Sequence, residues 1–372
     1  MPITLDGTNG ITTPMYNGSI TANAVTPSVN MKNRIINGAM VLNQRNTTVS
    51  ASDSGWQYAV DRWAAYQNIA SSKFTLAGSS TAPTGFTNSL LATSSSAYTV
   101  GASEFFTIRQ PIEGFNTADL GWGTANAKTV TLSFWVRSSL TGTFAGFIQN
   151  ANDGSRTYPF TYTISSANTF EQKSITIAGD TSGTWLTNNG AGPAVCFSMG
   201  CGSTYLGTAN AWTGSTVFGV TGQTNLVATN GATFYITGVQ LEVGSTATSF
   251  DYRSYGTELQ LCYRYFQSMF NATANGCPTD SFTQATSATD SYGILSYLQT
   301  MRSAPTMSLT STIRLTDQSA ITNVTTFTLD AGRTGTQTGE VRAATASGLT
   351  TYRTYNLING SSTTAINLSA EL

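Results

Sequence analysis

The sequence has 372 residues, of which 40% are hydrophobic, 11% are aromatic and 9% are charged, and its formal net charge is -1. This apolar content excludes intrinsic disorder, and the length leads us to expect two domains. The near-neutral charge lacks the excess of Lys and Arg that nucleic-acid binding requires, so we expect no nucleic-acid partner.

The residue types present also limit the chemistry. The chain contains no histidine, which excludes Ser-His-Asp and Cys-His catalytic sites and zinc sites with histidine ligands. The four cysteines match neither a zinc motif nor a dense disulfide framework, and we expect them to be small buried residues: Cys196, Cys201, Cys262 and Cys277. We therefore expect no metal and no cofactor.

The first residues have little apolar periodicity. Residues 1–30 are rich in Gly, Pro, Thr and Asn, and we expect an extended N-terminal attachment arm; a frayed tail is the alternative. The start MPITLDGTNG lacks the layout of a signal peptide, and no stretch of the chain approaches the roughly 20 apolar residues of a membrane span. We expect neither membrane insertion nor export by the usual secretory route.

From Met31 onward, short alternating runs are separated by turn-forming residues, as in antiparallel strands. The run at residues 129–136 (TVTLSFWV) places on one face Val130, Leu132, Phe134 and Val136. Further runs lie at residues 144–148, 158–164, 170–177, 194–199 and 234–243. Because no long amphipathic helix intervenes, residues 31–254 are predicted to form a jelly-roll β-sandwich.

The pattern changes near residues 257–270 (TELQLCYRYFQSMF), which predict one helical turn running into a strand. Further alternating runs at residues 306–315, 324–329, 341–346 and 365–368 predict a second, smaller β domain over residues 255–372. The predicted fold class is therefore all-β throughout.

A chain this poor in charge places several charged residues around two short apolar segments near its start, NRIINGAMVLNQRN and YAVDRWAAY. Asp61 and Arg62 lie beside Trp63, and we expect them to form a partly buried, structural ion pair. Arg34 or Arg45 is expected to donate to backbone carbonyls.

Aromatic side chains are the best candidates for ligand binding, because sugar rings stack their C–H faces on aromatic rings. Four of them lie in segments rich in Gly, Thr and Asn that are predicted to be loops: Trp122, Trp185, Tyr205 and Trp212. Trp56, Trp63 and Trp135 are weaker candidates, since aromatic residues in strands more often belong to the core.

Catalysis by paired carboxylates needs two acids facing each other. Glu104, Glu113, Asp119, Asp153 and Asp180 lie in no distinctive motif, and Asp153 (NDG) and Asp180 (GDTSG) are typical of tight turns. We therefore expect no catalytic residues and no enzymatic activity.

Several segments resemble parts of known proteins. NRIINGAMVLNQRN (residues 33–46), followed by Asp61, Arg62 and Trp63, resembles a segment near the start of tail-fibre and related virion proteins of tailed bacteriophages. ITGVQLEVGSTATSFDYRSYGTELQLCYRYFQ (residues 236–267) resembles the end of the jelly-roll module of those proteins and its exit into a C-terminal domain. SGLTTYRTYNL (residues 347–357) and the final AEL resemble the close of such chains.

In that family the module is a carbohydrate-binding-like jelly roll on a virion appendage that is often trimeric. The resemblance implies a bacteriophage virion protein on the exterior of the tail or capsid, namely a tail fibre or receptor-binding appendage that adheres to a host-surface glycan or another receptor. It also implies a homotrimer, and other virion proteins are expected to bind the N-terminal arm. Two alternatives stay open: a purely structural capsid decoration or tail adaptor protein and, less favoured, a polysaccharide depolymerase.

Overall fold

The structure is a computed structural model that describes residues 4–6, 10–12, 31–270 and 273–372. It divides into two units, Met1–Lys32 and Asn33–Leu372. In the first unit, β1 (Thr4–Asp6) and β2 (Gly10–Thr12) pair in antiparallel fashion. The rest of the expected N-terminal arm lies outside the described residues.

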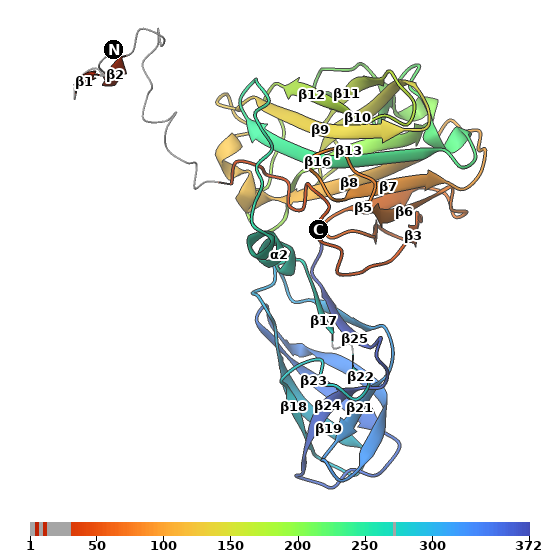
Figure 1. Cartoon of the computed structure of the whole chain (residues 1–372), viewed down its shortest axis with the longest axis vertical. Helices are drawn as coiled ribbons and strands as arrows, with labels where there is room; N and C mark the ends of the chain where they lie inside the picture. Colours follow the sequence, from red (N-terminus) through yellow and green to blue (C-terminus); the bar gives the residue numbers. More distant parts are fainter. Residues whose placement is uncertain (1–3, 7–9, 13–30, 271–272) are drawn as a thin grey trace. The chain divides into compact units, whose positions relative to one another are not determined.

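The first part of the second unit is a β-sandwich of two six-stranded sheets (Figure 1). The first sheet has the order β11 (Thr157–Ile164), β10 (Gly142–Asn150), β13 (Ala191–Cys201), β8 (Phe105–Glu113), β5 (Ala64–Gln67) and β4 (Gln57–Tyr58). The second has the order β12 (Glu171–Ile177), β9 (Val130–Ser138), β16 (Thr233–Val243), β7 (Ser89–Ser94), β6 (Phe74–Ser79) and β3 (Val49–Ser50). This arrangement confirms the predicted sandwich.

Strand β9 shows why these residues form a sandwich. Its alternate side chains Val130, Leu132, Phe134 and Val136 are fully buried between the sheets, as the two-residue period predicts, while Trp135 faces outward and is partly exposed. The same core includes Trp63, also fully buried. Two short parallel strands, β14 (Leu206–Gly207) and β15 (Gly219–Val220), pair beside the sandwich.

The chain leaves the sandwich through α2 (Tyr255–Tyr263), whose first turn is capped by the Ser254 hydroxyl accepting from the backbone N–H of Thr257. The helix is followed by β17 (Phe266–Phe270), which confirms the predicted change from helix to strand. None of the described helices combines the length and apolarity needed to cross a membrane.

The second part of this unit is a closed six-stranded barrel with its own apolar core. The barrel order is β18 (Phe282–Ala285), β19 (Asp290–Ser296), β23 (Thr338–Thr345), β22 (Ile321–Thr334), β21 (Ile313–Thr316) and β24 (Thr354–Asn359). A three-stranded sheet joins β17 to β25 (Ala365–Ser369) and β20 (Thr306–Leu309). The smaller β domain that the sequence predicts is therefore a barrel.

The sandwich and the residues after β25 are linked by charged side chains. Arg62 forms an ion pair with Glu371, and its guanidinium carbon lies 3.6 Å from the centre of the Tyr265 ring. Arg45 lies 3.0 Å from the same Glu371 carboxylate, and Arg302 donates to the backbone oxygens of residues 370 and 371. We call this cluster of Arg45, Arg62, Arg302 and Glu371 the joint.

A second charged contact lies beside the joint. Glu113, at the end of β8, accepts from Arg264 Nε at 2.7 Å and from the Tyr265 hydroxyl at 2.7 Å. The hydrogen bonds from Arg264 to Glu113 raise the pKa of Arg264. The segments that resemble virion proteins thus supply much of the structural link between sandwich and barrel.

Candidate functional site

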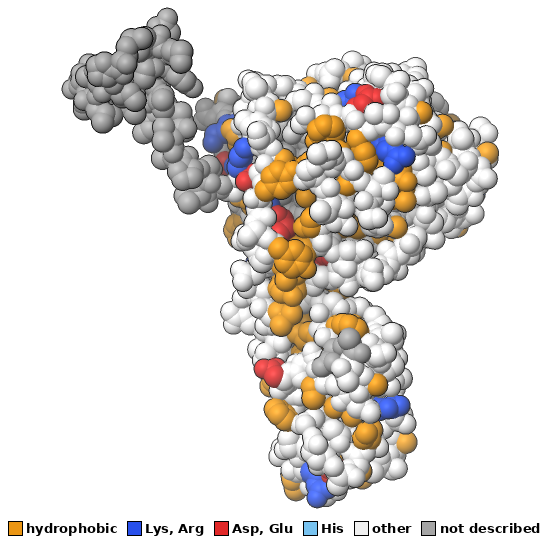
Figure 2. All heavy atoms as spheres, in the orientation of Figure 1, with side chains coloured by type: hydrophobic (Ala, Val, Ile, Leu, Met, Phe, Trp, Pro, Cys, Tyr) orange, Lys and Arg blue, Asp and Glu red, His pale blue; other side chains and the backbone are white. Residues whose placement is uncertain are grey.

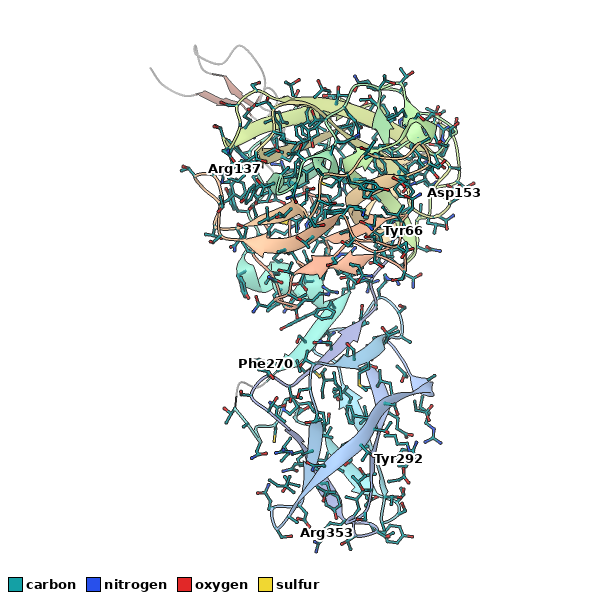
Figure 3. All side chains as sticks on the ribbon, turned by 90° about the vertical axis from the view of Figure 1, so that its right-hand side faces the viewer. Tyr66, Arg137, Asp153, Phe270, Tyr292 and Arg353 are labelled. Carbon is teal, nitrogen blue, oxygen red and sulfur yellow. The ribbon has the colours of Figure 1, made fainter. Side chains whose placement is uncertain are left out.

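The outer face of the first sheet carries an aromatic surface that its strand pattern builds. In β8, Phe106 and Ile108 point into the core, so their neighbours Phe105, Thr107 and Arg109 point outward. Tyr66 on β5 lies directly opposite Thr107. Figure 3 shows Tyr66 and Arg137 on opposite sides of the sandwich, so the two outer faces can be considered separately.

This face is hollowed over an open volume of about 430 Å³. Aromatic rings form most of the lining, with a few polar side chains among them: Asp53, Ser54, Trp56, Tyr66, Phe105, Thr107, Phe147, Gln149 and Phe218. We call this the aromatic hollow. An apolar lining with a small number of placed polar groups is the usual composition of a small-ligand site.

The rings of the aromatic hollow form a continuous wall. The Trp56 and Tyr66 ring centres are 5.0 Å apart, and those of Tyr66 and Phe105 are 5.7 Å apart. Phe218 continues the wall at 4.3 Å from Phe105. The Arg109 guanidinium carbon lies 3.6 Å from the centre of the Trp56 ring and supports it from the sheet side. Burial lowers the pKa of Arg109.

Thr107 is the polar group that best indicates a ligand. Its side chain is 1% exposed and lines the aromatic hollow, yet its hydroxyl has no hydrogen-bond partner among the described residues. A buried hydroxyl without a partner costs about 1–3 kcal/mol, so most such groups in native proteins are satisfied. A ligand hydroxyl in the aromatic hollow could satisfy this one.

Three of the four sequence-predicted ligand residues lie elsewhere and contact one another. The Trp122, Trp185 and Trp212 rings form a mutual edge-to-face trio with centre distances of 4.9, 5.3 and 5.6 Å. Each indole N–H donates to a backbone carbonyl, namely those of Lys128, Ser182 and Ala178. The trio packs against the sandwich core, and its polar groups are already used within the chain.

The fourth predicted ligand residue, Tyr205, lies beside the aromatic hollow and contacts two of its rings. Its ring lies 5.2 Å from both Phe105 and Phe218, which line the hollow. Sequence reasoning ranked Trp56 below the loop tryptophans, although it sits in the wall itself. The turn-rich stretch SDSG immediately before Trp56 was the available signal that this residue lies in a loop, directly before the edge strand β4.

The structure pairs Asp61 and Arg62 differently from the sequence prediction. Asp61 accepts from the backbone N–H of Gln44 at 2.7 Å and lies 3.7 Å from Arg45, whereas Arg62 pairs with Glu371. Adjacent residues direct their side chains apart here, since Arg62 adopts a left-handed backbone with φ of 71°. Burial raises the pKa of Asp61, although Arg45 lowers it. Both residues are structural, and they belong to one network in which Arg45 contacts Asp61 and Glu371, and Glu371 pairs with Arg62.

Each of the five candidate carboxylates already has a hydrogen-bond or ion-pair partner within the protein. Glu104 accepts from the Tyr98 hydroxyl, Asp119 pairs with Arg34, Asp153 caps its own turn through Ser155, and Asp180 pairs with Arg156. Glu113 is bound by Arg264 and Tyr265, as described above. Within the described residues, no group of three or more His, Cys, Asp or Glu side chains is placed to hold a metal ion.

Three of the cysteines are buried as expected, while Cys277 is exposed. Burial raises the pKa of both the Cys196 thiol and the Cys201 thiol to about 12. Cys196 lies on the outer face of the first sheet opposite Arg109. A thiol with so high a pKa is a poor nucleophile at neutral pH, so these residues pack as small apolar groups.

No family model matches the sequence, and no curated protein matches it. Among solved structures, the sandwich is distantly similar to carbohydrate-binding modules. A family 11 module from Clostridium thermocellum, in complex with a mixed-linked tetrasaccharide, is 9% identical over 54% of this chain and 98% of that chain, with a TM-score of 0.27. A xylan-binding domain from Paenibacillus barcinonensis is 9% identical over 54% and 95%, with a TM-score of 0.28.

A bacteriophage protein is also among the similar structures. The enzymatically active domain of tailspike protein 4 from bacteriophage CBA120 is 15% identical to this chain, with a TM-score of 0.32. The match covers 57% of this chain and 22% of the tailspike chain, so this chain spans less than a quarter of that protein. Similarity at this level concerns the jelly-roll, carbohydrate-binding-like fold.

Proposed function

We propose that this protein is a non-enzymatic adhesin of a bacteriophage virion that binds a host-surface saccharide in the aromatic hollow. The single observation that carries the binding proposal is the buried hydroxyl of Thr107, which lines the aromatic hollow and has no hydrogen-bond partner among the residues that the structure describes. Stacking on Trp56 and Tyr66 and a hydrogen bond to Thr107 together suit a ring with apolar C–H faces and hydroxyl groups.

The segments at residues 33–46 and 236–267 support the virion part of the proposal through their resemblance to tail-fibre and related proteins. A position on the tail or capsid exterior follows from the same resemblance. We further propose a homotrimer, because β20 is an outer strand of a three-stranded sheet and can pair with another chain, whereas Gln44 already bonds the backbone of β17 at Phe266 and Ser268. Light scattering on the purified full chain gives its mass and tests the trimer.

The experiment that tests saccharide binding uses the full chain on a panel of immobilised bacterial surface polysaccharides. We expect saturable binding to at least one polysaccharide, lost in Trp56→Ala and in Thr107→Val. Trp212→Phe is the matched aromatic control outside the hollow and should bind like the parent protein. Equal binding by the parent and both hollow variants would overturn the proposal, as would release of reducing ends from the bound polysaccharide.

A purely structural role as a capsid decoration or tail adaptor is the second candidate, and the tryptophan trio favours it. All three indole N–H groups are satisfied inside the chain, which is the arrangement of a packing element. Failure of the folded protein to bind any polysaccharide of the panel would select this function.

A further inference from the structure

The outer face of the second sheet carries a second aromatic surface, on the side of the sandwich away from the aromatic hollow. Figure 2 shows hydrophobic side chains on the face where β9 and β16 lie in Figure 1. The strand register aligns Leu91, Tyr235 and Arg137 in one cross-strand row and places Thr237 opposite Trp135 in the next. Gln172 lies opposite Trp135 on its other side and is exposed.

Arg137 is held on this face by aromatic rings. Its guanidinium carbon lies 4.9 Å from the centre of the Tyr235 ring and 5.9 Å from that of Phe170. These two rings are themselves 6.3 Å apart. The contacts fix the guanidinium near the surface by cation–π attraction, without using any of its five N–H donors.

Arg137 differs from the other arginines in having no polar partner in the part of the chain that the structure describes. Within the described residues it forms no hydrogen bond and no ion pair, and its Nε atom is buried. Every other arginine of the chain donates a hydrogen bond: Arg34, Arg45, Arg62, Arg109, Arg156, Arg253, Arg264, Arg302, Arg314, Arg333, Arg342 and Arg353. A second polar atom of this face, the hydroxyl of the fully buried Thr237, also has no partner.

The acidic residue at the start of the neighbouring strand β12, Glu171, does not neutralise this cation. Glu171 precedes the residue paired with Trp135, but its carboxylate lies 2.6 Å from Lys173 Nζ and accepts from the backbone N–H groups of Ser165 and Ser166. Arg137 therefore remains an unneutralised, preorganised fork of donors. Such a fork matches the paired oxygens of a carboxylate or a phosphate.

We propose that Arg137, with Trp135 and Tyr235, forms a second binding site that takes the anionic group of an acidic saccharide. The guanidinium binds the carboxylate of a uronic acid or the phosphate of a sugar phosphate, which share this chemistry. The rings of Trp135 and Tyr235, with the Gln172 amide beside them, contact the sugar itself. This site does not depend on the aromatic hollow, which lies on the opposite face.

The test is calorimetric titration of the full chain with an oligogalacturonate, a hexose 6-phosphate and a neutral galactose oligomer of matched length. We expect at least one of the two anionic sugars to bind about 10-fold or more tightly than the neutral oligomer. Tighter binding of the oligogalacturonate would identify a carboxylate as the ligand group, and tighter binding of the hexose 6-phosphate would identify a phosphate. Arg137→Gln should lose that preference, and added salt should weaken binding of the parent protein. Trp56→Ala should leave the preference for the anionic sugar unchanged.

Two further variants separate binding from folding. Arg314→Gln removes an arginine from the barrel, with the same change in net charge, and should bind like the parent protein. Arg137→Met keeps the apolar stem and should lower the melting temperature only slightly, because the cation–π contacts with Tyr235 and Phe170 are lost but no hydrogen bond or ion pair among the described residues is. The proposal is overturned if Arg137→Gln binds as tightly as the parent, if anionic and neutral sugars bind alike, or if neither anionic sugar binds. Equally tight binding of an acidic peptide such as polyglutamate would overturn the saccharide assignment.

Discussion

Arg62 and Glu371 form a buried ion pair although 309 positions separate them in the sequence. Their side chains are 1% and 6% exposed, and the Tyr265 ring covers the guanidinium. The charges of the NRIINGAMVLNQRN and DRW segments are therefore used in part to hold residues that follow the last barrel strand. This relationship makes the joint the place where stability should be most sensitive to a loss of charge.

Glu371→Ala should destabilise the protein strongly. The substitution leaves Arg62 buried without its counter-charge, and breaking a buried pair in this way costs about 3–5 kcal/mol. The free energy of unfolding in urea measures the loss. Glu340→Ala is the matched control, because its partner Arg333 is 67% exposed and such a surface pair contributes about 1 kcal/mol or less. Similar losses in both variants would contradict the structural role of the joint.

Thr107→Val should keep the fold and remove saccharide binding in the aromatic hollow. Valine has nearly the same shape, and it removes a buried hydroxyl whose missing partner costs about 1–3 kcal/mol. The free energy of unfolding should therefore stay equal or rise, while binding to the polysaccharide panel falls. A clear loss of stability would show instead that the hydroxyl has a partner inside the protein.

Trp122→Ala should have the opposite effects, namely a loss of stability without a loss of saccharide binding. Trp122 is buried, donates to the Lys128 carbonyl and contacts two other tryptophans, so its removal leaves a cavity that costs about 3–5 kcal/mol. We expect a lower urea midpoint, with saccharide binding unchanged under conditions where the variant is folded. Loss of binding by the folded variant would show that the tryptophan trio contributes to ligand binding.

Stability should fall at alkaline pH. Burial raises the pKa of the Tyr58 hydroxyl to about 12, above its value of about 10 in an unfolded chain. Above pH 10 the unfolded state loses a proton that the native state keeps, so the free energy of unfolding decreases by about 1.4 kcal/mol per pH unit until the folded pKa is reached. The stabilisation is fully present below pH 10.

The buried thiols lower the pH at which the stability begins to fall. Cys196 and Cys201 also have pKa values raised to about 12, against about 8.5 in an unfolded chain. Urea midpoints measured between pH 7 and pH 11.5 should therefore begin to fall near pH 8.5 and fall more steeply above pH 10. Tyr58→Phe should reduce the additional slope above pH 10, to which Tyr297 also contributes because its pKa is likewise raised to about 12. A midpoint independent of pH would contradict the buried state of these groups.

Local sequence pattern predicted many of the strands of the fold. The run TVTLSFWV in β9 shows strict alternation because only one of its faces is fully buried. Strand β8 was not predicted, since FFTIRQPIE is largely buried on both faces and contains Arg109 and Pro111 on its outer face. Alternation disappears where a second layer of rings covers the outer side of a strand.

The candidate sites were less predictable, because they depend on contacts between distant strands. Thr107 and Arg109 are ordinary strand residues in the sequence, and only the pairing of β8 with β5 and β13 places them beneath Trp56 and Tyr66. Likewise, no local pattern shows that Arg137 is without a partner. The loop composition around Trp122, Trp185 and Trp212 was visible in the sequence, but their mutual packing was not.

The pairing of β17 with β25 has a further consequence. Phe270 lies opposite Ala365 in the register, so the chain enters and leaves the barrel through two neighbouring antiparallel strands. Antiparallel partners have Cα atoms only about 4.5–5.5 Å apart. A different domain with closely spaced termini can therefore be placed between these two positions, provided that it replaces the contacts that β20 makes with β25 and that Arg302 makes with residues 370 and 371. Such exchange offers a route by which one β-sandwich acquires different C-terminal domains.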